Sequence, residues 1–196
     1  IGFVTTLDYE NPYLSPYDEM QRFKTHPAIQ PMLEGGRRIA YGARAINEGG
    51  LQSVPKLTFP GGCLIGCSAG FVNVPRIKGT HNAMKTGMLA AEEVFLALGA
   101  GRERDELIDY ELAYEKSWVY KDLHRVRNVR PALSKFGVIM GTIYAGFDMW
   151  LNTFGLGCLL PWNFGHRADH KQLKLASEMP KIEYPKPDGK ITFDKL

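Results

Sequence analysis

The sequence contains little cysteine, and its cysteines are not spaced as a binding site. Cys63, Cys67 and Cys158 are the only three in 196 residues, too few for a disulfide framework. Cys63 and Cys67 are close in sequence, but no second cysteine pair or nearby histidine completes a zinc or iron–sulfur site. These absences fit a reducing or membrane-facing compartment better than secretion.

Long apolar runs and a large excess of charge are also missing. The longest apolar stretch covers residues 136–147, whereas a membrane-spanning helix needs about 20 apolar residues. A stretch of this length predicts a core helix or a segment at a membrane interface. The formal net charge of +3 does not indicate a nucleic-acid-binding protein. No signal or transit peptide is recognisable at Ile1, and we expect an internal piece of a longer protein.

What remains is the composition and patterning of a folded domain. Hydrophobic residues make up 44% and charged residues 23% of the chain, which argues against intrinsic disorder. The patterns predict an α+β chain, with strands over residues 1–7, 37–46 and 63–66 and helices over 17–26, 81–98 and 106–128. A short edge strand is expected at Leu57 and Phe59. The tail from residue 168 is polar and interrupted by prolines.

The helix over residues 81–98 has two contrasting faces. One is an apolar stripe, formed by Met84, Met88, Ala91, Phe95 and Leu98. The other is made of small residues, namely Ala83, Gly87, Ala90, Val94 and Ala97. This pattern predicts a mostly buried helix with its small face against a sheet or another backbone. Thr80 is the expected N-cap, and Gly99 the expected stop.

A strand, an irregular loop and this helix follow one another between residues 63 and 98. The unpaired amides of Gly79, Thr80, His81 and Asn82 would carry the positive end of the helix dipole, which suits an anion or a dipole. A flavin fits, because its N1/C2=O edge becomes negative on reduction. The alternative from these residues alone is a plain buried helix.

The same region carries a recognisable motif. The sequence GCLIGCSAGFVNVPRIKGTHNAMKTGMLAAE, residues 62–92, closely resembles the second FAD-binding motif of the electron-transfer flavoprotein–ubiquinone oxidoreductase family. The segments LDYENPYLSPYDEMQRFKTHPAI, LEGGRRIAYGARAINEGGLQSVPKLTFPGG, VRNVRP and IEYPKPDGKITFD resemble further parts of that family. The resemblance covers nearly the whole chain.

The resemblance implies a fold and a division of the chain. We expect an α+β fragment of a hydroxybenzoate-hydroxylase-like FAD-binding fold, with part of the quinone-binding domain and a monotopic membrane-contact region. The parts would be the end of the quinone-binding domain at 1–45, the FAD-domain strand, loop and helix at 46–104, a helical membrane-contacting region at 105–165 and a linker at 166–196. The family's GxGxxG motif and its ferredoxin-like domain, whose four cysteines bind a [4Fe-4S] cluster, do not occur in this chain.

The resemblance also implies cofactor-binding residues. They are Gly66, Cys67, Ser68, Gly79, Thr80, His81 and Asn82, with Asn47 and Gln52 as further candidates. Cys67 stands where related flavoproteins have an aspartate that binds the ribityl chain, so its amide or Ser68 would serve instead. Thr80 is the best candidate for a side-chain hydrogen bond to the flavin. We expect no catalytic side chain and no metal ligand in this chain, and His81 to contribute its amide rather than a proton.

The region after residue 125 has the pattern of a membrane anchor. Basic residues precede an apolar run, and Trp150, Phe154 and Trp162 follow it. The expected membrane-contact residues are Arg130, Val138, Ile139, Met140, Ile143, Tyr144 and Phe147. The alternative is an internal hairpin, in which Gly137, Gly141 and Ala145 pack on another helix.

By this resemblance, the full enzyme passes electrons from reduced electron-transfer flavoprotein through FAD and a 4Fe-4S cluster to ubiquinone. It would lie on an inner membrane as a peripheral or monotopic protein, on the mitochondrial matrix face or the bacterial cytoplasmic face. Its partners would be the flavoprotein, ubiquinone and the membrane surface, without nucleic acid. The alternatives are another flavoprotein dehydrogenase of the FixC/geranylgeranyl-reductase group, or a non-catalytic membrane-associated fragment.

Overall fold

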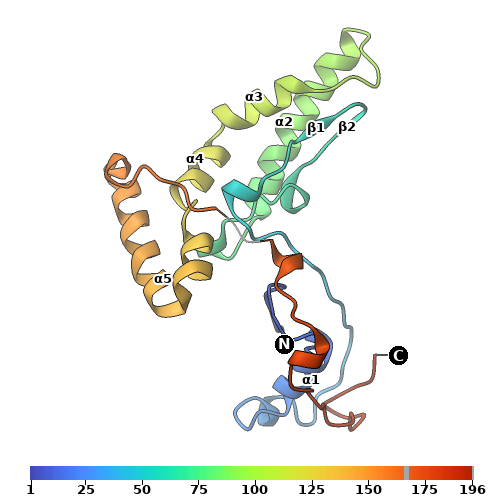
Figure 1. The fold of residues 1–196 in the computed structure, drawn as a ribbon. Helices are drawn as coiled ribbons and strands as arrows, with labels where there is room; N and C mark the ends of the chain where they lie inside the picture. The colour runs from blue at the N-terminus through green and yellow to red at the C-terminus, as the bar shows by residue number, and fades with distance from the viewer. Residues whose placement is uncertain (166–167, 196) are drawn as a thin grey trace. The chain divides into compact units, whose positions relative to one another are not determined.

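The computed structural model describes residues 1–165 and 168–195, which form two compact units (Figure 1). One unit combines residues 1–43 with 168–195, and the other contains residues 44–165. Helices with one small sheet make up the regular structure, which agrees with the expected α+β class. No described helix has the length and hydropathy needed to cross a membrane.

The first unit is built around α1 (Pro16–Lys24), which confirms the helix expected there. Ser15 caps its N-terminus and Pro16 occupies its first turn, where a missing N–H is tolerated. The C-terminal tail packs against this helix. The Tyr184 hydroxyl accepts from Ser15 N–H at 3.1 Å, and Gln21 Oε1 accepts from Phe193 N–H at 3.0 Å. The tail, expected as a linker, thus shares a unit with the start of the chain.

The strands predicted over residues 1–7 and 37–46 are not formed. Neither segment contains a strand, and most residues of both segments are exposed. Strand propensity describes how well a side chain fits a paired, half-buried surface, and the described residues offer these segments no partner strand. The only described sheet is a hairpin of β1 (Thr58–Phe59) and β2 (Gly62–Cys63), antiparallel with Thr58 opposite Cys63. Of the strand predicted at 63–66, only Cys63 lies in the observed strand β2.

The second unit is organised by α2 (Thr80–Gly99), whose span agrees with the predicted helix. Its N-cap is Gly79, and Thr80 is the first helical residue rather than the cap. The buried residues are Asn82, Thr86, Leu89, Ala90 and Ala97. The predicted apolar stripe is wrong as a buried face, because Met84, Met88, Phe95 and Leu98 are all exposed. The prediction of a mostly buried helix is also wrong, and of the predicted small-residue face only Ala90 and Ala97 are buried, whereas Val94 is exposed.

The single helix predicted over residues 106–128 is divided in two. α3 (Ile108–Lys116) ends before Ser117, and α4 (Trp118–Arg125) begins after it. The Ser117 hydroxyl accepts from the amides of Val119 and Tyr120, which caps α4. The core lies between these helices and α2, and its largest fully buried side chains are Phe71, Tyr110, Val119 and Leu123.

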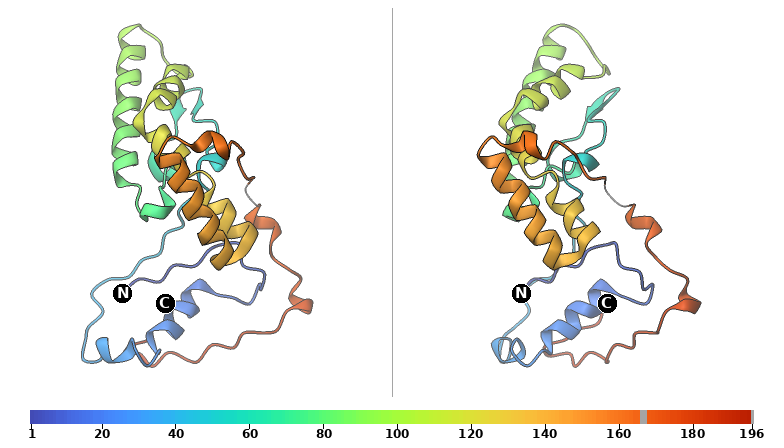
Figure 2. Two further views of the ribbon diagram at one scale, coloured as in Figure 1. Left: turned by 90° about the vertical axis from the view of Figure 1, so that its left-hand side faces the viewer. Right: turned by 60° about the vertical axis from the view of Figure 1, so that its left-hand side comes forward.

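The last helix, α5 (Val129–Thr153), is a hairpin of two helical legs. Gly137 has φ +75° and turns the chain between them. Pro131 lies in the first turn of α5, where its missing N–H is tolerated. A Cβ at Gly141 would lie 2.7 Å from Leu133 Cα and 2.8 Å from the carbonyl oxygen of Ala132. The legs therefore lie side by side (Figure 2), at a separation that only glycine permits here.

Substituting Gly141 by alanine should open this hairpin. The added methyl group meets backbone atoms of the other leg, so we expect the free energy of local opening to fall by about 1–3 kcal/mol. Hydrogen exchange of peptides covering residues 129–153 measures it. Gly146→Ala is the matched control, because nothing lies within 4 Å of a Cβ there. Equal protection in the G141A variant and the wild type would contradict the close packing of the legs.

Candidate functional site

The loop that connects β2 to α2 passes unusually close to the helix. Gly66 is buried with φ +59°, and a Cβ there would lie 3.0 Å from Ala83 Cβ. Its N–H donates to Thr86 Oγ1 at 3.2 Å. Because both the backbone conformation and the space exclude larger residues, Gly66 brings the loop backbone against the first turns of α2.

Asn82 holds the other end of the loop. Its side chain is fully buried, and Nδ2 donates to the carbonyl of Phe71 at 2.9 Å. Among the described residues, its Oδ1 is buried without a hydrogen-bond partner. Asn82 was expected to contact a cofactor. Its side chain instead faces the protein interior and positions the loop, so any contact with a ligand would come from its backbone N–H.

The outer side of this loop presents polar groups. Cys67, Ser68 and Thr80 are exposed. The Ala83 amide donates to Gly79 C=O at 2.8 Å as the first bond of the helix, and the amides of Thr80, His81 and Asn82 precede it. Gly79 has no side chain with which to cap them. The arrangement is therefore a donor-rich helix start beside a loop without bulky side chains.

The two outlying candidates differ in where they lie. Asn47 contacts the loop, since a Cβ at Gly70 (φ +84°) would lie 3.0 Å from Asn47 Nδ2. Gln52 donates through Nε2 to the carbonyl of Phe164 at 3.1 Å, and its Oε1 is buried without a partner in the described part of the chain. The structure thus brings Asn47 to the loop, whereas Gln52 links residues 51–53 to the segment after α5.

His81 turns toward α4 rather than outward. Its ring stacks on Trp118 with centroids 5.7 Å apart, and its Nε2 lies 3.9 Å from Asp122 Oδ2. Asp122 also accepts from Asn73 at 2.7 Å. These contacts were not predicted from the sequence, because Asn73 and Asp122 are 49 positions apart and no shared motif or periodic pattern connects them.

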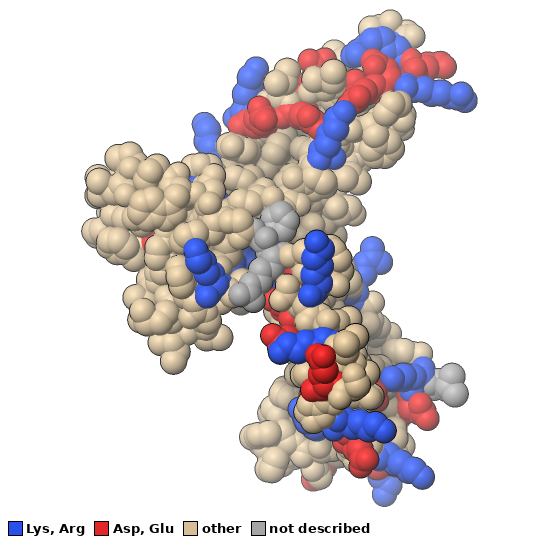
Figure 3. Space-filling model, in the orientation of Figure 1, with Lys and Arg blue, Asp and Glu red and all other residues tan. Residues whose placement is uncertain are grey.

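The α5 hairpin exposes a continuous apolar surface. Five of the predicted membrane-contact residues are between 53% and 78% exposed, namely Val138, Ile139, Met140, Ile143 and Phe147. Trp150 and Phe154 extend this surface along the second leg. In Figure 3 the surface over α5 carries few charged residues, whereas the end formed by α2 and α3 carries both signs. So much apolar surface on one element is unusual for a face in contact with water.

Two of the predicted membrane-contact residues lie elsewhere on the hairpin. Tyr144 is half-buried, and its ring packs on Phe136 and Phe164 with centroids 5.8 and 5.1 Å away. Its hydroxyl accepts from Trp162 Nε1 at 2.8 Å. Arg130 is half-buried in the first turn of α5. Tyr144 therefore joins the hairpin to the segment that follows it.

The base of the hairpin is a buried polar network. Arg127 is 3% exposed and donates to Asn152 Oδ1 at 2.9 Å and to the carbonyl of Leu160 at 3.2 Å. Asn128 donates to Asp148 Oδ1 at 3.3 Å and to the carbonyl of Trp162 at 3.0 Å. Burial raises the pKa of Asp148 above its ordinary value. The network fixes the hairpin and the segment after it to the end of α4.

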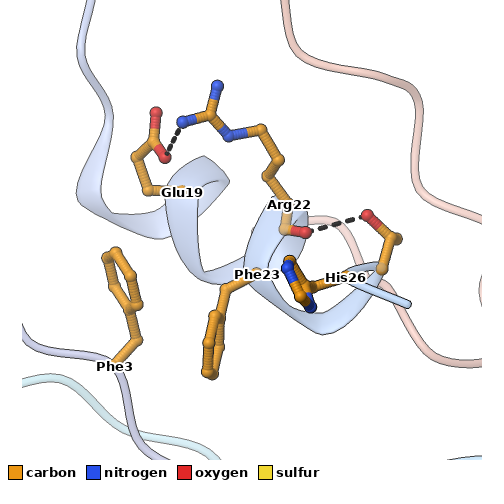
Figure 4. Close-up of a pocket in the computed structure, with 6 residues that line it drawn as sticks. Phe3, Glu19, Arg22, Phe23 and His26 are labelled. Atoms are coloured by element: carbon orange, nitrogen blue, oxygen red, sulfur yellow. Dashed lines mark hydrogen bonds and ion pairs between the residues drawn. The ribbon is translucent and has the colours of Figure 1, made fainter. Parts of the chain in front are cut away.

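A separate hollow lies in the first unit. It has a volume of about 390 Å³ and is lined by Phe3, Glu19, Arg22, Phe23, Thr25 and His26. The Phe3 and Phe23 rings are 5.5 Å apart, and Glu19 pairs with Arg22 at 2.6 Å (Figure 4). In residues 1–165 and 168–195, no group of three or more His, Cys, Asp or Glu side chains is placed to hold a metal ion.

Comparison with known proteins gives one consistent result. A family model described as "ETF-QO, ubiquinone-binding" matches residues 1–46, which include the hollow beside α1. The chain is 56% identical to the mitochondrial electron transfer flavoprotein-ubiquinone oxidoreductase of Mus musculus and 54% identical to that of Homo sapiens. It is 53% identical to the electron transfer flavoprotein-ubiquinone oxidoreductase of Pseudomonas aeruginosa.

The similarity covers all of this chain but only part of each relative. Each alignment includes 100% of the chain, 32% of the mouse and human proteins and 35% of the bacterial one. The chain thus spans about a third of the length of the curated relatives it matches. The resemblance stated from the motifs is confirmed, and the relatives are by name oxidoreductases.

Asp148→Asn should change how stability depends on pH. Since its pKa is raised in the folded protein, Asp148 contributes most to stability below about pH 4, and this contribution is lost as the pH rises through the folded-state pKa. An amide cannot ionise, so the melting temperature of the variant should rise relative to that of the wild type as the pH increases from about 4 to 7. The control is the same substitution at exposed Asp109. A difference that stays constant with pH would contradict a buried, ionisable Asp148.

Proposed function

We propose that this chain is part of an electron transfer flavoprotein–ubiquinone oxidoreductase, in which it supplies one side of the FAD site and the contact with the membrane. In the whole enzyme, electrons pass from reduced electron transfer flavoprotein through FAD and a 4Fe-4S cluster to ubiquinone. The observation that carries the proposal is the convergence of a glycine-lined loop and a free helix start in a chain at least 53% identical to three such enzymes.

The residues of the loop fit a flavin. Gly66 and Gly70 let the loop backbone lie against Ala83 and Asn47, where a Cβ would clash, and so keep the loop close to the start of α2, where we place the flavin. Thr80 supplies a hydroxyl, and the amides of Gly79, Thr80 and His81 provide the positive end of α2. FAD would supply the two-electron centre that can also exchange single electrons. The chain's own contribution is to bind its polar edge and favour negative charge there.

The described residues do not provide a cluster site. Cys63 lies in β2 with a pKa raised by burial, Cys67 is exposed in the loop and Cys158 follows α5. A 4Fe-4S cluster needs four ligands, normally thiolates. We therefore assign the cluster to a part of the enzyme outside the described residues.

The α5 hairpin is the proposed membrane contact. Ubiquinone is confined to lipid, so an enzyme that reduces it must reach the bilayer. Val138, Ile139 and Met140 lie at the turn between the legs, where an apolar tip would enter the interface first. We infer a peripheral or monotopic protein of an inner membrane, on the matrix face in mitochondria or the cytoplasmic face in bacteria.

The test is an assay of the protein expressed from its complete reading frame. Reduced electron transfer flavoprotein should reduce a soluble ubiquinone analogue only when this protein is present, and the purified protein should be yellow. Transfer of electrons to another acceptor but not to ubiquinone would favour a FixC/geranylgeranyl-reductase-type dehydrogenase. A colourless protein that binds vesicles would favour the non-catalytic alternative.

Thr80→Val should lower the flavin midpoint potential. A hydroxyl that donates to the flavin stabilises its reduced, more negative form, and the loss of about 1–1.4 kcal/mol corresponds to about 20–30 mV for two electrons. Spectroelectrochemical titration measures the shift. Thr153→Val, at an exposed position on α5, is the control and should leave the potential unchanged. An unchanged potential in T80V would rule out this hydrogen bond.

Replacing Ile139 and Ile143 by glutamate should release the protein from membranes. Burial of each isoleucine side chain in lipid would contribute about 2 kcal/mol to the free energy of binding, and a carboxylate would oppose insertion. We expect at least a tenfold lower partition onto phosphatidylcholine–cardiolipin vesicles, measured by sedimentation. The control is Leu112→Glu on α3, an exposed leucine away from the hairpin. Vesicle binding that survives both hairpin substitutions would place the membrane contact elsewhere.

A further inference from the structure

Asp122 on α4 contacts three polar side chains near the start of α2, and none of these contacts has a role in the function proposed above. Its side chain on α4 is 12% exposed. Its Oδ2 accepts from Asn73 Nδ2 at 2.7 Å, and its Oδ1 lies 3.4 Å from Arg76 Nη2. His81 Nε2 lies 3.9 Å from Oδ2. These three partners stand on both sides of Gly79, so one carboxylate faces the chain before and after the helix start.

Asn73 connects Asp122 to the loop before α2. It is fully buried, and its Oδ1 accepts from the Arg76 amide at 3.3 Å. Its backbone pairs with Lys78, with Asn73 N–H donating to Lys78 C=O at 3.0 Å. Residues 73–78 therefore form a closed turn that leads directly into Gly79. Where Asp122 holds Asn73, it also holds the entry to α2.

His81 connects α4 to the first turn of α2. Its ring lies nearly parallel to Trp118, with an interplanar angle of 8°, and its Nε2 is buried without a hydrogen-bond partner among the described residues. Trp118 and Asp122 are four residues apart on α4 and so lie on one face of that helix. One face of α4 thus contacts the first turn of α2.

We propose that Asp122 is a positioning residue of the flavin site, which sets where the first amides of α2 and the Thr80 hydroxyl point. The inference rests on the proposed function, because it assigns these groups to the flavin. Within the described part of the chain, Asp122 acts on these groups through Asn73, Arg76 and His81 and makes no hydrogen bond to Thr80. Its effect is to fix the turn of residues 73–78 and His81 in relation to α4.

A carboxylate suits this position better than an amide. The groups that face it are the Asn73 amide, the Arg76 guanidinium and the His81 ring, all of which can donate. An ionised carboxylate only accepts, so both of its oxygens match donors. In Asp122→Asn, one of the two positions would carry an NH2 group that faces another donor.

The central experiment compares three variants of the full-length protein. Asp122→Asn removes the charge and one acceptor. The exchange variant Asn73→Asp/Asp122→Asn restores a carboxylate–amide pair across the same 2.7 Å contact, and an aspartate at 73 can still accept from the Arg76 amide. Asp109→Asn changes an exposed aspartate of α3 and is the matched control. The readouts are the FAD dissociation constant of the apoprotein, the flavin midpoint potential and hydrogen exchange of residues 73–82.

We expect Asp122→Asn to raise the FAD dissociation constant on the order of tenfold, the effect of one charge-assisted hydrogen bond. Hydrogen exchange over residues 73–82 should become faster in the apoprotein. The midpoint potential should fall, since misaligned amides stabilise the reduced flavin less. The exchange variant should recover most of each effect, and Asp109→Asn should match the wild type.

Two results would overturn the inference. They are wild-type FAD affinity in Asp122→Asn and an exchange variant as defective as the single variant. If wild-type affinity is accompanied by a raised potential, Asp122 acts through space by its charge, because removing a negative charge favours reduction. If Asp122→Asn does not fold, Arg76→Gln at the half-exposed guanidinium tests the same contact and should shift affinity and potential in the same directions.

The inference and the proposed function fail in different ways. A wild-type protein that binds no FAD would refute the proposed function before any variant is made. A wild-type protein that binds FAD and reduces ubiquinone, together with variants that match it, would refute only the role of Asp122.

Discussion

The unit of residues 44–165 depends on one electrostatic constraint: withdrawing a polar side chain from water costs free energy unless the protein supplies hydrogen bonds in exchange. Three asparagines, Asn73, Asn82 and Asn128, are fully buried there. Asn82 holds the loop before α2, Asn73 joins that loop to α4, and Asn128 joins the start of α5 to the segment after it. Since an unpaired buried amide costs about 1–3 kcal/mol, each of these contacts excludes neighbouring arrangements that apolar packing alone would tolerate.

The parts of the fold that the sequence predicted are those with local signals. α1 and α2 carry local signals at both ends, and their predicted spans agree with the structure. The turn at Gly137 was not predicted, and the close packing at Gly141 was foreseen only in the alternative of an internal hairpin. The predicted strands over 1–7 and 37–46 failed because a strand needs a partner, and a pattern within one segment does not say whether the chain supplies it.

The failure at α2 has the same origin. The stripe of Met84, Met88, Phe95 and Leu98 has the period of a buried helix face, yet the described residues cover the opposite side. Hydrophobic period identifies a face that can be buried, not the surface that will bury it. The chain spans about a third of its relatives' length, so a pattern can refer to neighbours that this stretch does not contain. The pairing of Asn73 with Asp122 was missed for a related reason, because single polar contacts across 49 residues leave no periodic trace.

The α5 hairpin combines an apolar tip with a polar base, and this order has a physical consequence. Val138, Ile139 and Met140 are exposed at the turn, whereas Arg127, Asn128 and Asp148 are buried where the legs meet α4. Lipid can replace water around the side chains of the tip without leaving a polar side chain unpaired, because these side chains are apolar. The base differs, because Arg127 and Asn128 are withdrawn from the surface and take their hydrogen bonds from the segment after α5. The polar network therefore fixes the apolar surface of the hairpin in one orientation relative to α4 and to the segment after α5.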